Sequence, residues 1–476
     1  MSVTKKTNRT GMNFNRTSKK SESAMNRPES FHACFFAEKK KLFQLWLPKY
    51  SAALTGILLL LTYLNPVPLS AQVPAAIQSE PVALTGATIH TVSDGVIENG
   101  TILFEGGTIT AIGTEIELPS NTVVRDVTGR HIYPGFIDAY SEMGIYEIGA
   151  VDMTLDINEQ GSINPNVRPE AAFNPESRHI GIARSSGVLV TVTTPDGGLI
   201  SGKSTAMMLD GWTWETMVVK SGTGLIVNWP SPLNEDDYEE GLQILRDYFA
   251  DARTYRKAYR AVESGDIPRL DFDIRLNSMI PVLEGDIPVV VNANDLRQIQ
   301  DAVTWAEEEE VEIVILGGRD APYVANHLAS RNIPVIVTTV LASPGRAWEP
   351  YDNRYSLPAK LQQAGIRFAI AGASSAPYTN RLPYEAGAAA AYGLDPDMAL
   401  HSITLAPAEI LGFNDRLGSL EPGKDATLII TTGNPLEYST QIEQAYIEGR
   451  EIDMNDMHRQ FYERYQEKVR QAETGR

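Results

Sequence analysis

Short apolar runs and longer amphipathic stretches alternate through the middle of the chain. An apolar run that is buried on both faces is typical of a strand in a parallel sheet, and a helix between two such runs returns the chain so that they can pair. A count near eight units over roughly 250 residues favours a closed (β/α)8 barrel, and an open doubly wound sheet is the alternative. The expected strands are 131–137, 188–192, 287–291, 311–316, 333–340 and 367–371, and the expected helices are 235–262, 295–309, 321–330, 357–364 and 384–392.

Two β-rich segments flank this region. Residues 81–130 contain short apolar runs separated by the turn signals Asp94-Gly95 and Gly106-Gly107. Residues 413–452 have the same character, so the two segments are expected to complete one small composite β-sandwich. The predicted organisation is an α/β barrel of residues 131–412 inserted into that sandwich, followed at 453–476 by a charged helix with a solvated face.

The first 71 residues differ from the rest. Lys39, Lys40, Lys41 and Lys49 precede an apolar run at 51–64, which is followed by the small-residue end Leu69-Ser70-Ala71. This order predicts an export signal cleaved after Ala71 and a periplasmic or secreted protein. The apolar run is shorter than the ~20 residues of a spanning helix, so no stable membrane span is expected after cleavage.

Charge and cysteine content exclude several kinds of partner and site. The formal net charge of −19 makes nucleic acid an unfavourable partner. The only cysteine, Cys34, excludes disulfides within the chain and any zinc cluster built from its cysteines.

Several phrases resemble the amidohydrolase superfamily, in particular its imidazolonepropionase-like branch. Tyr133-Pro-Gly-Phe-Ile-Asp138 resembles that family's opening barrel strand, and residues 404–412, 417–426 and 446–449 resemble its closing elements. The resemblance implies a barrel with a metal-dependent site that hydrolyses C–N bonds in cyclic amides, peptides or similar substrates. Such a site needs one or two divalent ions to lower the pKa of a water molecule.

The positions that match the family's metal ligands hold other residues. The family ends its first strand in His-x-His, where this chain has Tyr140-Ser141-Glu142. Asn292 and either Gly317 or Gly318 stand where the resemblance implies histidines, and Ala373 or Ser374 stands where it implies an aspartate. No histidine beyond residue 71 can replace these ligands, because none lies at the carboxyl end of an expected strand. The six are His90, His131, His179, His327, His401 and His458.

Two functions remain open. The first is a non-catalytic binding or partner subunit with no cofactor, paired with a catalytically intact paralogous amidohydrolase or with itself, and able to take a small molecule. The second is a hydrolase of C–N bonds with an altered site around Glu142, Asn292 and Ser374. In that case carboxylates would hold Zn²⁺, Mn²⁺ or Mg²⁺. Glu142 is the best single metal candidate among the acids near expected strand ends, which also include Asp138, Asp196, Asp286 and Asp320.

A phosphate-loop pattern occurs at Gly197 to Ser204. Phosphate binding by this motif requires a helix directly after the loop, and the following residues show little helical periodicity. We therefore interpret the stretch as a loop at the barrel mouth, with Trp212 and Trp214 packed against the protein.

Overall fold

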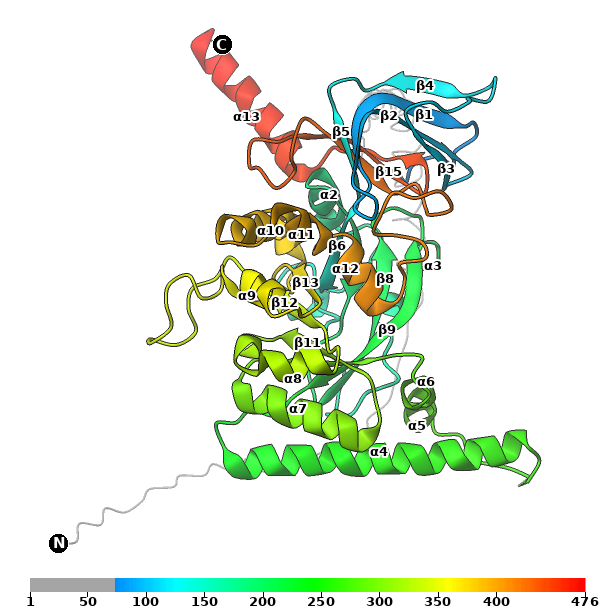
Figure 1. The fold of residues 1–476 in the computed structure, drawn as a ribbon, viewed down its shortest axis with the longest axis vertical. Coiled ribbons are helices and arrows are strands. Elements are labelled where there is room, and N and C mark those ends of the chain that lie inside the picture. The colour runs from blue at the N-terminus through cyan, green and yellow to red at the C-terminus, as the bar shows by residue number, and fades with distance from the viewer. Residues whose placement is uncertain (1–72, 267, 476) are drawn as a thin grey trace, which may run out of the picture. The chain divides into compact units, whose positions relative to one another are not determined.

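The computed structural model describes residues 73–266 and 268–475, and the predicted export segment lies outside these residues (Figure 1). The described chain forms two eight-stranded sheets. Within this described part, no helix is both long enough and apolar enough to cross a bilayer.

The first sheet curls into a nearly closed barrel. Its strands follow one another in chain order, and at the seam the amide of Gly372 donates a hydrogen bond to Asp138 Oδ1 at 3.2 Å. The predicted α/β barrel is therefore confirmed, and the open doubly wound sheet is wrong. The strands are β6 (Phe136–Ser141), β7 (Val188–Thr193), β8 (Ile200–Met208), β9 (Val218–Asn228), β10 (Val289–Ala293), β11 (Ile313–Gly317), β12 (Val335–Thr338) and β13 (Phe368–Ala371).

Strand β8 runs antiparallel to both of its neighbours, β7 and β9, while every other pairing in the barrel sheet is parallel. The loop predicted at Gly197 to Ser204 is therefore wrong beyond Leu199, because Ile200–Met208 pairs on both sides. Gly202 enters this strand with φ +144, and a Cβ there would lie 2.9 Å from the carbonyl oxygen of Val167. Glycine at position 202 allows β8 to pass close to the backbone of Val167. It is part of a paired strand and not of a phosphate-binding loop.

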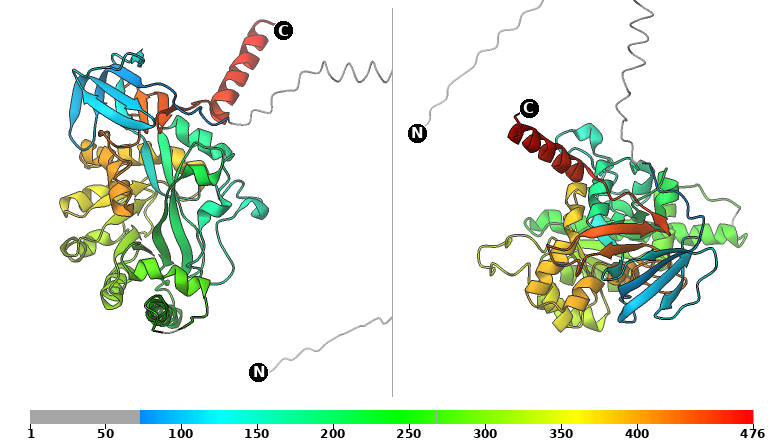
Figure 2. Two further views of the ribbon diagram at one scale, coloured as in Figure 1. Left: turned by 90° about the vertical axis from the view of Figure 1, so that its right-hand side faces the viewer. Right: turned by 90° about the horizontal axis from the view of Figure 1, so that it is seen from above.

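Helices cover the outside of the barrel (Figure 2). The longest, α4 (Glu235–Glu263), buries residues three or four apart, such as Leu242, Leu245 and Phe249, and Asn234 caps its first turn. The others are α2 (Arg178–Ser185), α3 (Trp214–Met217), α5 (Ile274–Ser278), α6 (Ile280–Leu283), α7 (Leu296–Glu309), α8 (Ala325–Ser330), α9 (Leu357–Gln363), α10 (Leu382–Ala391), α11 (Pro396–His401) and α12 (Leu405–Leu411), with 3-10 turns η1 (Asp152–Thr154), η2 (Pro169–Ala172), η3 (Ala321–Val324) and η4 (Ala376–Arg381).

The second sheet joins segments from the two ends of the described chain. β5 (His131–Pro134) pairs with β14 (Leu428–Thr431) on one side and with β1 (Val82–His90) on the other. The sheet is completed by β2 (Val96–Glu105), β3 (Thr108–Gly113), β4 (Val123–Asp126), β15 (Ile442–Ile447) and β16 (Arg450–Glu451).

The single strand expected at 131–137 is wrong, because the chain changes sheets at Gly135. A Cβ at this position would lie 2.7 Å from Leu189 Cδ1, so only glycine allows the close passage from β5 to β6. The chain ends in helix α13 (Met457–Glu473), within the segment 453–476 where a charged helix was expected. Trp214 is partly buried against the core, but Trp212 is 68% exposed, so its predicted packing is wrong.

Candidate functional site at the barrel mouth

The carboxyl ends of the parallel strands define the mouth of the barrel, which is where side chains from several strands can converge. Glu142 follows β6 and Ser374 follows β13, and the seam of the barrel brings the two together. The amide of Glu142 donates to the carbonyl oxygen of Ser374 at 2.7 Å, and the hydroxyl groups of Ser374 and Ser375 hydrogen-bond to the Glu142 carboxylate. These residues are two of the positions singled out from the sequence, and the structure places them in direct contact.

Glu142 is only 6% exposed, and its surroundings shift the pKa of its carboxyl group in two directions. Burial raises its pKa, and the nearby negative charge of Asp196 adds to that effect. Hydrogen bonds from the two serines oppose the rise because they stabilise the charged form. Tyr140 lies beside both acids, and burial followed by these charges raises the pKa of its phenol, so the phenol keeps its proton and can donate.

Asp138 is fully buried beneath this pair. Its Oδ1 accepts hydrogen bonds from the amides of Gly372 and Tyr140, at 3.2 and 3.4 Å. Its Oδ2 is buried, and the Thr379 side chain hydrogen-bonds to the carboxyl group, which acts against the effect of burial on its pKa. Burial raises the pKa of Asp138 to about 7, so this carboxyl group can exchange a proton near neutral pH. From the sequence, Asp138 was one of the acids near expected strand ends; its deep burial could not be predicted, because it depends on how the barrel closes.

Asn292 belongs to a separate group of amides at the mouth. Its Nδ2 donates to Asn228 Oδ1 at 3.2 Å, and Asn228 in turn donates to Gly198 O and Ser201 Oγ, both at 3.0 Å. The hydrogen bond of Asn292 thus goes to β9 and not to Glu142.

Gly317 ends β11 with φ +92, and a Cβ there would lie 2.5 Å from Asn294 Oδ1. A larger residue at this position would have to adopt a positive φ and displace the Asn294 side chain, so the local backbone favours glycine here. Which of Gly317 and Gly318 matches a ligand position of the family stays a prediction.

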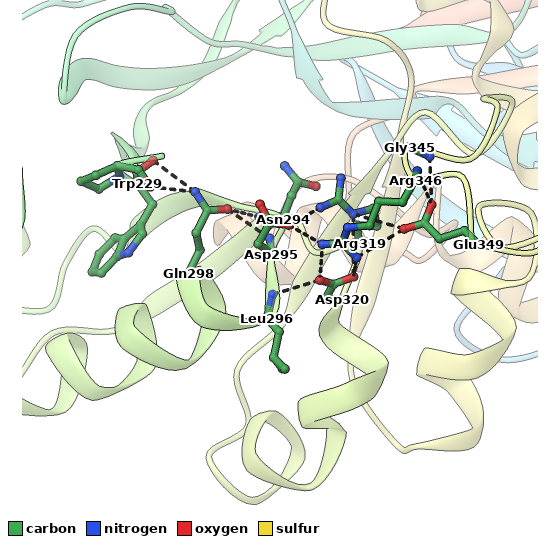
Figure 3. A network of polar contacts seen from close by, with 11 residues as sticks. Trp229, Asn294, Asp295, Leu296, Gln298, Arg319, Asp320, Gly345, Arg346 and Glu349 are labelled. Carbon is green, nitrogen blue, oxygen red and sulfur yellow. Dashed lines mark hydrogen bonds and ion pairs between the residues drawn. The ribbon is translucent and has the colours of Figure 1, made fainter. Parts of the chain in front are cut away.

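A network of ion pairs joins the segments that follow β10, β11 and β12 (Figure 3). Arg346, from the loop after β12, contacts Asp295 and reaches Asp320 at 2.7 Å and Glu349 at 3.3 Å. Arg319 contacts Asp295 from the neighbouring strand end. Asp320 is 3% exposed and also accepts the amide of Leu296 at 3.0 Å. This network was not predicted, because the partners Asp295, Arg319 and Arg346 are far apart in sequence and no local pattern joins them.

The remaining candidates lie elsewhere. Asp286 precedes β10 and so lies at the opposite end of that strand, which makes its predicted place near a mouth wrong. His90 and His131 lie in the second sheet, with His90 Nε2 3.0 Å from His131 Nδ1 and the His90 ring stacked on Tyr133. His179 lies in α2, with its Nε2 3.0 Å from the carbonyl oxygen of Glu147.

Comparisons with known proteins agree with this architecture. Residues 352–455 match the amidohydrolase family. An amidohydrolase from Thermotoga maritima MSB8 superposes with a TM-score of 0.72 at 26% identity, over 78% of this chain and 99% of that one. The fold is that of the amidohydrolases. A prolidase superposes at 15% identity with a TM-score of 0.51, over 78% of this chain and 99% of that one, which shows the shared fold alone.

A curated relative, the amidohydrolase tasK of Hapsidospora irregularis, is 23% identical over 391 residues. The match covers 74% of this chain but only 39% of tasK, so the chain spans well under half of that relative's length. These likenesses do not separate the branches of the amidohydrolase superfamily, so the imidazolonepropionase-like assignment stays a prediction.

The residues at this mouth do not fit the divalent metal that an amidohydrolase fold implies. Within residues 73–266 and 268–475, no three side chains of His, Cys, Asp or Glu converge so that they could hold an ion. The buried carboxylates that could serve as metal ligands at the mouth already have other partners. Glu142 accepts hydrogen bonds from the two serines, and Asp320 pairs with Arg346. No chemical step through a metal follows from these residues.

Proposed function

We propose that this chain is a non-catalytic subunit on an amidohydrolase scaffold, which uses its barrel mouth to bind a small molecule or a partner subunit. One observation carries the proposal. At the seam where the sequence resemblance implies metal ligands, the Glu142 carboxylate accepts hydrogen bonds from Ser374 and Ser375, and no imidazole of the described part of the chain acts on it. Serine hydroxyls and a single carboxylate make a hydrogen-bonding site, whereas water activation by a metal needs several donors around one ion.

The chemical cost of losing the ion supports the same proposal. A bound divalent ion brings the pKa of water from 15.7 to about 7, and this supplies hydroxide at neutral pH. Without that shift, attack on an amide has to overcome a much higher barrier. Within residues 73–266 and 268–475, no histidine hydrogen-bonds to either serine so as to act as its base: His90, His131 and His179 make their contacts elsewhere, and His327, His401 and His458 lie in α8, α11 and α13.

A second candidate is a hydrolase of C–N bonds with an altered carboxylate site, and one observation favours it. The pKa of Asp138 is about 7, the value at which a general acid or base works best near neutrality. Asp138 is fully buried, however, so substrate would have to reach it through Glu142 or Tyr140.

Hydrolysis assays on the full chain distinguish the two candidates. Cyclic imides and dipeptides would be offered to protein treated with EDTA and to protein supplied with Zn²⁺ or Mn²⁺, alongside the Glu142→Gln and Asp138→Asn variants. The subunit proposal expects no turnover above buffer in any arm and less than one tightly bound transition-metal ion per chain by elemental analysis. Turnover that Asp138→Asn or Glu142→Gln abolishes would overturn it in favour of the hydrolase.

We further propose that the chain is exported with cleavage after Ala71, and that it pairs with a catalytically intact paralogous amidohydrolase. Amino-terminal sequencing of the protein from the extracytoplasmic fraction tests the first: a start at Gln72 supports it, and a start upstream of residue 51 contradicts it. Co-expression with such a paralogue and tandem purification tests the second, and two species that elute separately would contradict it.

A further inference from the structure

Helix α13 meets the rest of the described chain at α2 and at the carbonyl oxygen of Ile442, to which Arg459 donates at 3.4 Å. It has 17 residues, none of them buried, and Figures 1 and 2 show it projecting from the body. Asp456 fixes its start by accepting hydrogen bonds from the amides of His458 and Arg459. A helix of about this length is only marginally stable in water unless one of its faces is covered.

One face of α13 is apolar. Phe461, Tyr462, Tyr465 and Val469 are 43, 66, 57 and 56% exposed, which is unusual for side chains of this size on one helix. Tyr462, Tyr465, Val469 and Ala472 are spaced by three, four and three residues. This is the spacing of the seam of a two-helix coiled coil.

The surface of the helix is hollowed along that seam. Tyr462, Tyr465, Gln466 and Val469 line the hollow, together with Arg470 at its edge. The first four residues stand at positions i, i+3, i+4 and i+7, and four residues in this arrangement form the hole that receives one side chain of a facing helix.

We propose that α13 pairs in antiparallel orientation with α13 of a second copy of this chain. Val469 of each helix then fills the hollow of the other, and Tyr462 of one helix lies opposite Ala472 of the other. Arg459 of each helix lies opposite Glu473 of the other, so one pair of opposite charges forms at each end of the two-helix interface.

The charge of the chain favours this orientation over a parallel one. The chain carries a formal net charge of −19, whereas α13 holds four basic and three acidic side chains. Antiparallel pairing places the two acidic bodies at opposite ends of the helices, while parallel pairing would bring them side by side. Lys468, which lies over the Tyr465 ring of its own helix at 5.8 Å, faces its own counterpart near the twofold axis. It is the one like-charge contact in the pair.

The pair of helices is a small interface. Four large side chains from each helix bury well below the ~1,200 Å² of a stable specific complex, so the dimer is expected to be weak and to depend on protein concentration.

Sedimentation velocity of the full chain from Gln72, over a concentration series, tests the proposal. The weight-average mass should rise from monomer toward dimer, and Val469→Glu should abolish the rise. Arg459→Glu alone should weaken the association, Arg459→Glu with Glu473→Arg should restore it, and Lys468→Gln should strengthen it. Glu463→Lys, on the opposite face, is the matched control and should leave association unchanged. Circular dichroism confirms that each variant is folded.

Two outcomes would overturn the proposal. A wild-type chain that stays monomeric at the highest attainable concentration would show that α13 does not self-associate. A dimer that survives Val469→Glu, or that the double charge exchange fails to restore, would show that the copies meet through another surface or in another orientation.

Discussion

The amide of Gly372 donates to Asp138 across the seam between β13 and β6, so a fully buried acid links the first and last strands of the barrel sheet. The backbone of Gly372 packs closely against the carboxyl group: a Cβ added there would lie 3.4 Å from Asp138 Oδ2. The carboxyl group of Asp138 is therefore enclosed by protein. Enclosure raises the pKa of Asp138 to about 7, and several consequences can be measured.

Asp138→Asn should change how stability depends on pH. In the unfolded chain an aspartate titrates near pH 4, whereas folding raises the pKa of Asp138 to about 7. Between these values the folded state holds the extra proton, so this group makes stability fall as pH rises from about 4 to 7. The variant should therefore gain stability relative to wild type as pH increases, as measured by thermal unfolding at pH 5 and 8. An equal shift at both pH values would contradict this expectation.

His90 should make stability rise with pH, which is opposite to the effect of Asp138. Burial, followed by the neighbouring His131, lowers the pKa of His90 to about 4 from 6.5. The unfolded state binds the proton first, so the contribution of His90 is fully present above about pH 6.5 and is lost as pH falls toward 4. His90→Gln should flatten this part of the profile in denaturant titrations, whereas His458→Gln, at an exposed position, should leave it as in wild type.

Arg346→Ala should destabilise the protein more than removal of an exposed ion pair does. Arg346 is the shared partner of Asp295, Asp320 and Glu349, and the last two would stay buried without it. Arg319 would remain 3.7 Å from both of them, so they would lose one of two arginine partners, and the expected cost is roughly 1–3 kcal/mol. The control is Arg269→Ala, whose pair with Asp271 is 83 and 94% exposed and whose loss should cost less than about 0.5 kcal/mol. Equal midpoints for the two variants in urea would show that the network adds nothing.

Gly317→Ala should cost more stability than Gly365→Ala. Both glycines have positive φ, +92 and +68, and an added Cβ would meet Asn294 at the first position but nothing within 4 Å at the second. The two variants share the backbone strain, so their difference in unfolding free energy reports the clash alone. Equal costs would show that contact with the Asn294 side chain adds no penalty of its own.

Local patterns predicted the regular parts of this molecule well. The helix expected at 295–309 is α7 (Leu296–Glu309), and the strand expected at 367–371 is β13 (Phe368–Ala371), because apolar periodicity and capping residues are properties of the nearby sequence. The change of sheet at Gly135 was missed, since β5 and β6 form one apolar run and only their partners Leu428 and Val188 separate them.

The site was predictable in part for the same reason. Glu142 and Ser374 lie next to strand ends that can be read from the sequence, so the barrel geometry was enough to bring them together. The pKa of Asp138 depends on enclosure by residues more than 200 positions away, and the network around Arg346 depends on three separate loops. Long-range burial and ion pairing of this kind leave no periodic signal in a single sequence.

The reversed strand β8 has a structural consequence for any attempt to isolate the barrel. Just past its last residue, Asp210 receives Arg450 at 2.7 Å from the far end of the chain and Arg184 at 2.9 Å from α2. A protein trimmed to its central fold would lose Arg450 and leave the end of β8 without this clamp. The barrel and the second sheet therefore depend on each other for stability. A fragment that contains only one of them is not expected to fold on its own.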